Sequence, residues 1–126
     1  MSATPIEVIP GQGLGGIRIG TPISEISKIA SINNQFGHLD DIEFSIMDGK
    51  VAEVWINDLR KTKAGISIEG SHFSPDLSLE EIKQQIGPCV KLTGIKGGIF
   101  FRCRSGLLLG TDPFETGTFI QLRVVP

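Results

Sequence analysis

The chain has 126 residues, a formal charge of -2 and two cysteines. This length suits one domain that buries its own core without disulfides or metal ions, so we expect a single domain over residues 1–126. The near-neutral, interspersed charge disfavours a nucleic acid or a membrane surface as partner. No basic stretch leads into an apolar run near Met1, and no apolar stretch approaches ~20 residues. With so few cysteines, these features predict a cytoplasmic protein.

Two parts of the chain repeat one pattern of strand, short amphipathic helix and hairpin. The matching segments are 16–19 with 21–26, and 65–68 with 78–82. Neither unit could bury its apolar face alone, so we expect two weakly repeated αβ units, at about 11–60 and 61–126, that share one core. The predicted fold class is therefore α+β, with a single antiparallel β-sheet and two short helices packed on one of its faces.

Residues 11–16 match the pattern G-x-G-x-x-G and follow a strand predicted over 6–9. A dinucleotide fingerprint needs a helix directly after such a loop, because the helix N-terminus holds the phosphate. Residues 17–19 alternate as a strand instead, and Pro22 would interrupt a helix running on from the loop. We therefore predict that the glycines make a tight connection or bulge, and we expect no nucleotide cofactor.

The first helix is predicted to begin with Thr21 as its N-cap and Pro22 in its first turn. Ile23, Ile26 and Ile29 recur at helical spacing, so we expect them to form one buried face.

The dipeptide Asp48-Gly49 lies between two apolar runs and predicts a β-hairpin over 42–57. A two-residue turn would pair Ile46 with Val51, and Ile42 with Trp55. The predicted core face carries Ile42, Phe44, Ile46, Val51 and Trp55, with Glu53 at its edge and its carboxylate in water. The other face, predicted to be available for binding, carries Asp41, Glu43, Ser45, Lys50, Ala52, Val54 and Ile56.

The second helix has stronger end signals than the first. Ser78 and Glu81 match a capping box, and Gly87-Pro88 predicts the end of the helix. The strands expected after it cover 89–92, 99–103, 107–109 and 119–124 and form an antiparallel meander.

Cys89 and Cys103 would lie opposite each other if the intervening turn is centred on Lys96. A disulfide and a shared metal ion are the alternatives to two buried thiols that pack as small apolar side chains. We favour the thiols, because structural zinc needs four ligands and a reducing cytoplasm opposes disulfides. No metal site is therefore expected.

Other polar clusters have ordinary explanations. His38 lies near Asp40 and Asp41, and His72 lies near Ser71, Ser74 and Asp76. Both are predicted loop histidines rather than parts of a catalytic site, since nothing in the sequence shows that the groups converge. Phe100, Arg102 and Arg104 alternate on one strand face. They could stack on single-stranded nucleic acid, but charged strand edges protected from aggregation account for them equally well.

The opening segment, residues 15–26, resembles that of many small bacterial αβ proteins, where an isoleucine strand and Gly-Thr or Gly-Met precede a short helix. The tandem helix-plus-hairpin layout is similar to that of the β-lactamase inhibitory proteins and the BamE-type assembly lipoproteins. In size and in its Gly-rich opening, the chain also resembles immunity proteins that neutralise bacterial contact-dependent or type VI secreted toxins. This last resemblance implies a protein that binds and blocks a cognate toxin.

We therefore expect a protein-binding domain that uses charge to steer its partner. The predicted partner-binding residues are Asp40, Asp41, Glu43, Asp48, Val54, Ile56 and Asp58. A different class of function, a small enzyme or ligand-binding domain, would place its site between the two units, around His38, His72 and Cys89. A third alternative is an assembly subunit that pairs through an open strand edge.

Overall fold

The computed structural model describes residues 4–92, 98–104, 106–116 and 118–126, except for the side chain of Arg104. One sheet contains β1 (Ile6–Ile9), β2 (Gly13–Leu14), β3 (Ile17–Arg18), β8 (Ile66–Ile68) and β9 (Ser71–Phe73). The other contains β4 (Ser31–Asn33), β5 (Phe36–Leu39), β6 (Ile42–Met47), β7 (Lys50–Ile56), β10 (Val90–Leu92), β11 (Ile99–Arg104), β12 (Leu107–Thr111) and β13 (Ile120–Val124). The helices are α1 (Ile23–Ile26), the 3₁₀ helix η1 (Leu59–Lys61) and α2 (Leu79–Ile86).

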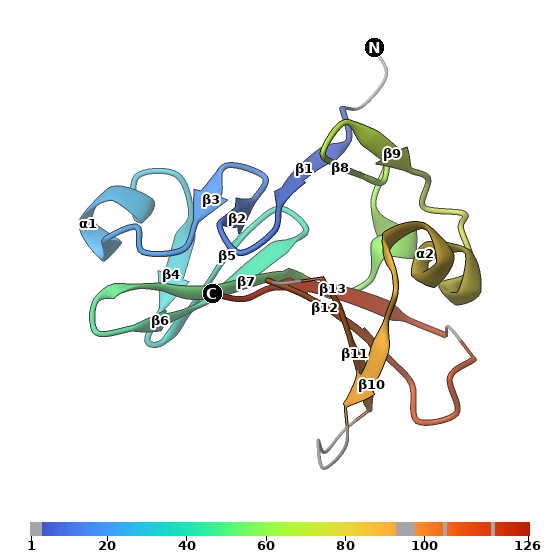
Figure 1. The fold of residues 1–126 in the computed structure, drawn as a ribbon. Helices are drawn as coiled ribbons and strands as arrows, with labels where there is room; N and C mark the ends of the chain where they lie inside the picture. The colour runs from blue at the N-terminus through green and yellow to red at the C-terminus, as the bar shows by residue number, and fades with distance from the viewer. Residues whose placement is uncertain (1–3, 93–97, 105, 117) are drawn as a thin grey trace.

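The described strands thus form two sheets, which corrects the predicted single sheet with two helices on one face (Figure 1). The five-stranded sheet has the order β3-β2-β1-β8-β9, and the eight-stranded sheet has the order β10-β11-β12-β13-β7-β6-β5-β4. The second sheet exists because β1 pairs in parallel with β8, Ile6 lying opposite Ile66. A pairing between segments so far apart leaves no periodic signal in either of them.

The order of elements expected from the repeat is present in both halves. Each half contributes strands to the five-stranded sheet, then a helix, and then a four-stranded meander, β4 to β7 or β10 to β13. The two meanders join where β7 and β13 pair antiparallel, with Trp55 opposite Arg123. The eight-stranded sheet is therefore built from both halves of the chain.

One hydrophobic core lies between the two sheets. Phe44 and Leu122 of the eight-stranded sheet are fully buried, together with Ile17 and Ile66 of the five-stranded sheet. Figure 1 shows the five-stranded sheet and α2 on the same side of the eight-stranded sheet. No described element covers the opposite side, which we call the outer face. No helix of the described residues has the length and apolar character needed to cross a membrane.

The second helix is confirmed and the first is only partly so. The side chain of Ser78 accepts a hydrogen bond from the Glu81 backbone N–H, and the Glu81 carboxylate accepts one from the Ser78 backbone N–H, which is the predicted capping box. In contrast, α1 has four residues, so Ile29 lies beyond it and is 53% exposed. Thr21 does not cap this helix, because its hydroxyl donates to the Arg18 carbonyl instead.

The β6–β7 hairpin turns where predicted, but the predicted register is wrong after the first two pairs. Ile46 pairs with Val51 as expected, whereas Ser45 pairs with Glu53, so Ala52 is an extra residue in β7. Such a β-bulge sets two residues of one strand against one residue of its partner. Because side chains alternate along a strand, the extra residue moves each later side chain to the opposite face.

The bulge reverses the roles predicted for the end of β7. Val54 and Ile56, expected on the solvated binding face, lie in the core and are 0% and 1% exposed. Trp55, expected in the core, lies on the outer face with Glu53 and is buried there by neighbouring side chains. Val54 and Ile56 therefore stabilise the fold rather than line a surface.

Cys89 and Cys103 form a disulfide, so the favoured prediction of two separate thiols is wrong for this structure. The bridge ties β10, which is an edge strand, to its neighbour β11. The turn predicted around Lys96 lies outside the described residues.

The glycines of residues 11–16 make tight connections, as predicted. They join β1, β2 and β3, and a strand rather than a helix follows them. A side chain on Gly13 would meet the Ile17 carbonyl oxygen at 2.3 Å, so only glycine fits this close approach. The dinucleotide geometry is therefore absent from this loop.

Candidate functional site

A continuous row of side chains crosses the outer face from β5 to β10. Successive cross-strand pairs place in one line His38, Glu43, Trp55, Arg123, Leu108, Arg102 and Val90. Directly opposed residues of neighbouring strands have Cβ atoms about 5 Å apart, so each member of the row lies beside the next. The row mixes aromatic, charged and apolar side chains, unlike the uniformly polar faces that antiparallel sheets commonly expose to water.

The centre of this row is a group that we call the Trp55 cluster: Phe36, Glu43, Glu53, Trp55 and Arg123. The indole Nε1 of Trp55 donates to Glu43 Oε2 at 3.2 Å. The Arg123 guanidinium lies 4.2 Å from the centroid of the Trp55 ring, and its Nη1 is 2.5 Å from Glu53 Oε1. Phe36 meets Trp55 edge to face, with ring centroids 6.4 Å apart. These contacts bury Trp55 and hold Phe36 and Arg123 in defined positions over it.

Two amides extend the hydrogen bonds of the Trp55 cluster. Asn57 Nδ2 donates to the second oxygen of Glu43 at 2.7 Å, and Gln121 Nε2 donates to Asn57 Oδ1 at 3.3 Å. Arg123 Nε donates in turn to Gln121 Oε1 at 3.5 Å. The carboxylates of Glu43 and Glu53 are thus both bonded within the chain.

An open hollow lies beside the Trp55 cluster. It is lined by residues 31–38, which form β4, β5 and their turn, and by Glu43. Phe36 is 57% exposed at this hollow, although it also contacts Trp55. An aromatic side chain in this position is available to a partner without leaving its place in the cluster.

The other end of the outer face is more apolar and, among its described side chains, has one cation. We call it the β10–β12 patch: Val90, Leu92, Phe100, Arg102 and Leu108. As predicted, Phe100 and Arg102 share a face of β11, while Phe101 and Cys103 point to the core. A Cβ on Gly110 would be 2.8 Å from the Phe100 ring, so the ring lies over the glycine backbone. The predicted companion, the side chain of Arg104, lies outside the described residues.

A second exposed aromatic, Phe114, projects from the loop after β12 and is 86% exposed. The Asp112 carboxylate organises this loop by accepting hydrogen bonds from the backbone N–H groups of Phe114, Thr116 and Thr118. Burial disfavours the charged form of Asp112, but hydrogen bonds from Thr116, Thr111 and Thr118 outweigh it and hold the pKa of this carboxyl well below its ordinary value of 3.8. Among the described residues, this loop shares no hydrogen bond, ion pair or ring contact with the Trp55 cluster, so it is a separate feature.

The acidic residues predicted to bind a partner do not form one surface. Asp40 and Asp41 lie in the β5–β6 turn and line a hollow with Lys63. Asp48 lies in the turn at the opposite end of β6, and six residues at ~3.4 Å each separate the two turns by about 20 Å. Glu43 belongs to the Trp55 cluster instead.

Asp58 has a structural position. Its carboxylate caps η1 by accepting from the backbone N–H of Arg60 at 3.1 Å, and it also accepts from the Ile120 N–H at 3.3 Å. It therefore ties η1 to the start of β13. The predicted acidic residues therefore lie in four separate places: the β5–β6 turn, the β6–β7 turn, the Trp55 cluster and the cap of η1.

The three residues of the alternative site are also separate. His38 lies on the outer face in the hollow beside the Trp55 cluster. His72 lies in β9 of the other sheet, where its Nε2 is 2.6 Å from the Ala64 carbonyl oxygen. Cys89 is bonded to Cys103. The structure does not bring these side chains together around one pocket.

Sequence reasoning missed the Trp55 cluster, although β7 carries a signal of it. The buried residues Val51, Val54 and Ile56 are spaced by three and then by two, and this break in strict alternation indicates a bulge. Within the described ranges, no group of three or more His, Cys, Asp or Glu residues could hold a metal ion. Comparison with protein-family models, curated proteins and solved structures finds no match for this chain.

Proposed function

We propose that this protein is a protein-binding domain that blocks its partner by covering it with the outer face of the eight-stranded sheet. The observation that carries the proposal is the Trp55 cluster, in which a buried tryptophan holds the exposed Phe36 and the partly exposed Arg123 in place on a face that no described element covers. Trp and Arg are among the side chains that contribute most to binding at protein interfaces. Because their neighbours already fix them, docking would cost little additional side-chain entropy.

The partner implied by the sequence resemblance is a cognate bacterial toxin, and we retain it as the proposed partner. A preorganised sheet face suits an inhibitor, because the interface backbone moves little when preorganised partners bind. The disulfide between Cys89 and Cys103 favours an oxidising compartment. We therefore place the proposed interaction outside the reducing cytoplasm, which departs from the location predicted from composition.

The test uses the purified protein and the product of the gene adjacent to its own, since a toxin and its immunity protein are expected to be encoded side by side. Complex formation is measured by size-exclusion chromatography and titration calorimetry. We expect Phe36→Ala to weaken binding by about tenfold or more, as for truncation of an aromatic anchor. The matched control is Phe114→Ala, which removes a more exposed ring that belongs to neither the Trp55 cluster nor the hollow beside it and should change affinity by less than about twofold.

The two phenylalanine variants separate the possible outcomes. Loss of binding in Phe36→Ala with an unchanged melting temperature supports docking on the outer face. Loss in Phe114→Ala alone would move the binding site to the loop organised by Asp112. The absence of a complex at micromolar concentrations would contradict the proposal.

The acidic steering predicted from the sequence has its own test. Asp41 is exposed and outside the Trp55 cluster, so Asp41→Lys should slow association with a basic partner surface without affecting folding. Glu43 is unsuitable for this purpose, because its loss would also release the Trp55 indole.

A further inference from the structure

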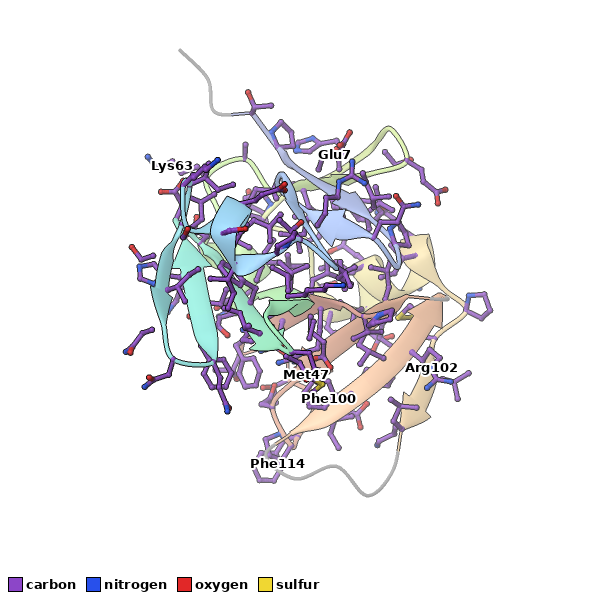
Figure 2. The ribbon with its side chains drawn as sticks, turned by 90° about the vertical axis from the view of Figure 1, so that its left-hand side faces the viewer. Glu7, Met47, Lys63, Phe100, Arg102 and Phe114 are labelled. Atoms are coloured by element: carbon purple, nitrogen blue, oxygen red, sulfur yellow. A yellow bond between two sulfur atoms is a disulfide. The ribbon has the colours of Figure 1, made fainter. Side chains whose placement is uncertain are left out.

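The β10–β12 patch surrounds a single arginine with apolar side chains. Arg102 lies directly opposite Val90 on one side and Leu108 on the other, and Phe100 precedes it on the same face of β11. Val90 is 64% exposed, and Arg102 is also exposed. Figure 2 shows Arg102 at the periphery of the molecule, directed away from the core and well separated from Phe114.

Arg102 differs from the charged groups of the Trp55 cluster in having no described side-chain partner. Arg123 is paired with Glu53 and stacked on Trp55, and Glu43 accepts from two donors. Among the residues that the structure describes, the Arg102 side chain makes neither an ion pair nor a hydrogen bond. Lys50 beside the β6–β7 turn is a second exposed cation of this face. Within the β10–β12 patch, the charge available for recognition is therefore positive and is carried by Arg102.

We infer that the binding partner presents a carboxylate, flanked by apolar side chains, to Arg102 in the β10–β12 patch. This inference rests on the proposed function and extends it to the chemistry of the partner. A protein that covers Val90, Phe100 and Leu108 must also remove water from the guanidinium between them. An unpaired charge is strongly unfavourable in such an interface, so a partner that fits must supply an anion at this position.

A carboxylate is the anion that matches this site. The planar guanidinium can donate two parallel hydrogen bonds to a carboxylate, while the apolar neighbours favour an apolar surface around it. A nucleic acid would need several cations spaced along its backbone, and the described part of this patch contains Arg102 alone. The partner surface that contacts the β10–β12 patch is therefore acidic. The acidic hairpin predicted from the sequence would instead have required a basic partner surface.

The test compares Arg102→Glu, Arg102→Gln and the control Lys63→Glu in binding to the partner purified in the experiment above. Lys63 is also an exposed cation, but it lies beside the β5–β6 turn and not in the β10–β12 patch. We expect Arg102→Gln to weaken binding by about 30-fold or more, and Arg102→Glu to weaken it further, because truncating one member of a covered charge pair leaves the other unpaired. Lys63→Glu should change affinity by less than about twofold.

A second measurement reports on charge itself. Between about 50 mM and about 500 mM NaCl, the wild-type association rate should fall more steeply than that of Arg102→Gln, because screening removes an attraction that the variant lacks. Replacing the partner carboxylate that contacts Arg102 by lysine should restore binding to Arg102→Glu. Circular dichroism melts of each variant check that the fold is intact.

The outcomes separate this inference from the proposed function. If Phe36→Ala loses affinity while both Arg102 variants bind as the wild type does, the outer face binds the partner and the inferred carboxylate contact is wrong. If neither position affects the complex, docking on the outer face is contradicted as well. If the candidate partner forms no complex, both proposals fail together.

Discussion

Reduction of the disulfide between Cys89 and Cys103 should destabilise the protein by about 3 kcal/mol. The two cysteines are 14 residues apart in the sequence, and chain-entropy estimates for cross-linking a loop of about 15 residues give about 3 kcal/mol at 25 °C. For a chain of this length, this loss corresponds to a decrease of roughly 10 °C in melting temperature. The effect should be largest at β10, since this edge strand has only three described pairs with β11.

The assay compares calorimetric melts of protein purified under oxidising conditions, before and after reduction, with a titration of free thiols. A Cys89→Ala/Cys103→Ala variant is the control, because it should melt near the reduced protein and show no response to reductant. Two free thiols in the oxidised protein would refute the assigned bridge. An unchanged melting temperature on reduction would refute the estimated contribution. Either result would also remove the support for an oxidising compartment.

Other substitutions test the fold and its electrostatics. Ile56→Ala should lower the free energy of unfolding in urea by about 2–5 kcal/mol, since the side chain is 1% exposed in the core. The control, Asp41→Ala at the exposed β5–β6 turn, should change it by less than about 0.5 kcal/mol. Equal losses of stability in the two variants would contradict the observed register. Ser78→Ala should destabilise α2 by about 1 kcal/mol, and a smaller effect from Ser78→Gly would confirm the cap. Because the folded-state pKa of Asp112 is depressed, its contribution to stability is present above the ordinary value of 3.8 and is lost as the pH falls below it. Asp112→Asn should therefore flatten the decline of melting temperature between about pH 4 and about pH 2, and an unaltered profile would contradict this assignment.

The elements that the sequence predicted well are those whose signals are local. The capping box of Ser78 and Glu81 and the helix end before Gly87 act within a few residues, and the structure has both. The turn between β6 and β7 is likewise present, with Asp48 and Gly49 at positive φ. Such features depend on neighbouring residues and therefore appear in the sequence itself.

The second sheet and the Trp55 cluster depend on contacts between distant residues. β1 and β8 pair across most of the first half of the chain, and Trp55 meets Arg123 only because β7 and β13 are neighbours. Alternation along a strand indicates which side chains share a face, but it does not identify the neighbouring strand. The sequence could therefore predict the β6–β7 hairpin but not that Arg123 of β13 packs on its Trp55.

One extra residue accounts for much of the difference between the predicted and observed binding surface. Without the bulge at Ala52, Trp55 and Glu53 would face the core, and Val54 would be exposed. With it, Glu53 reaches Arg123 on the outer face and Val54 joins the core. Glu43, expected to be free on the binding face, then accepts hydrogen bonds from Trp55 and Asn57, whereas Asp41 at the turn stays exposed. The bulge therefore also affects the charge expected of a partner, and in the β10–β12 patch Arg102 is the cation that a partner would have to match.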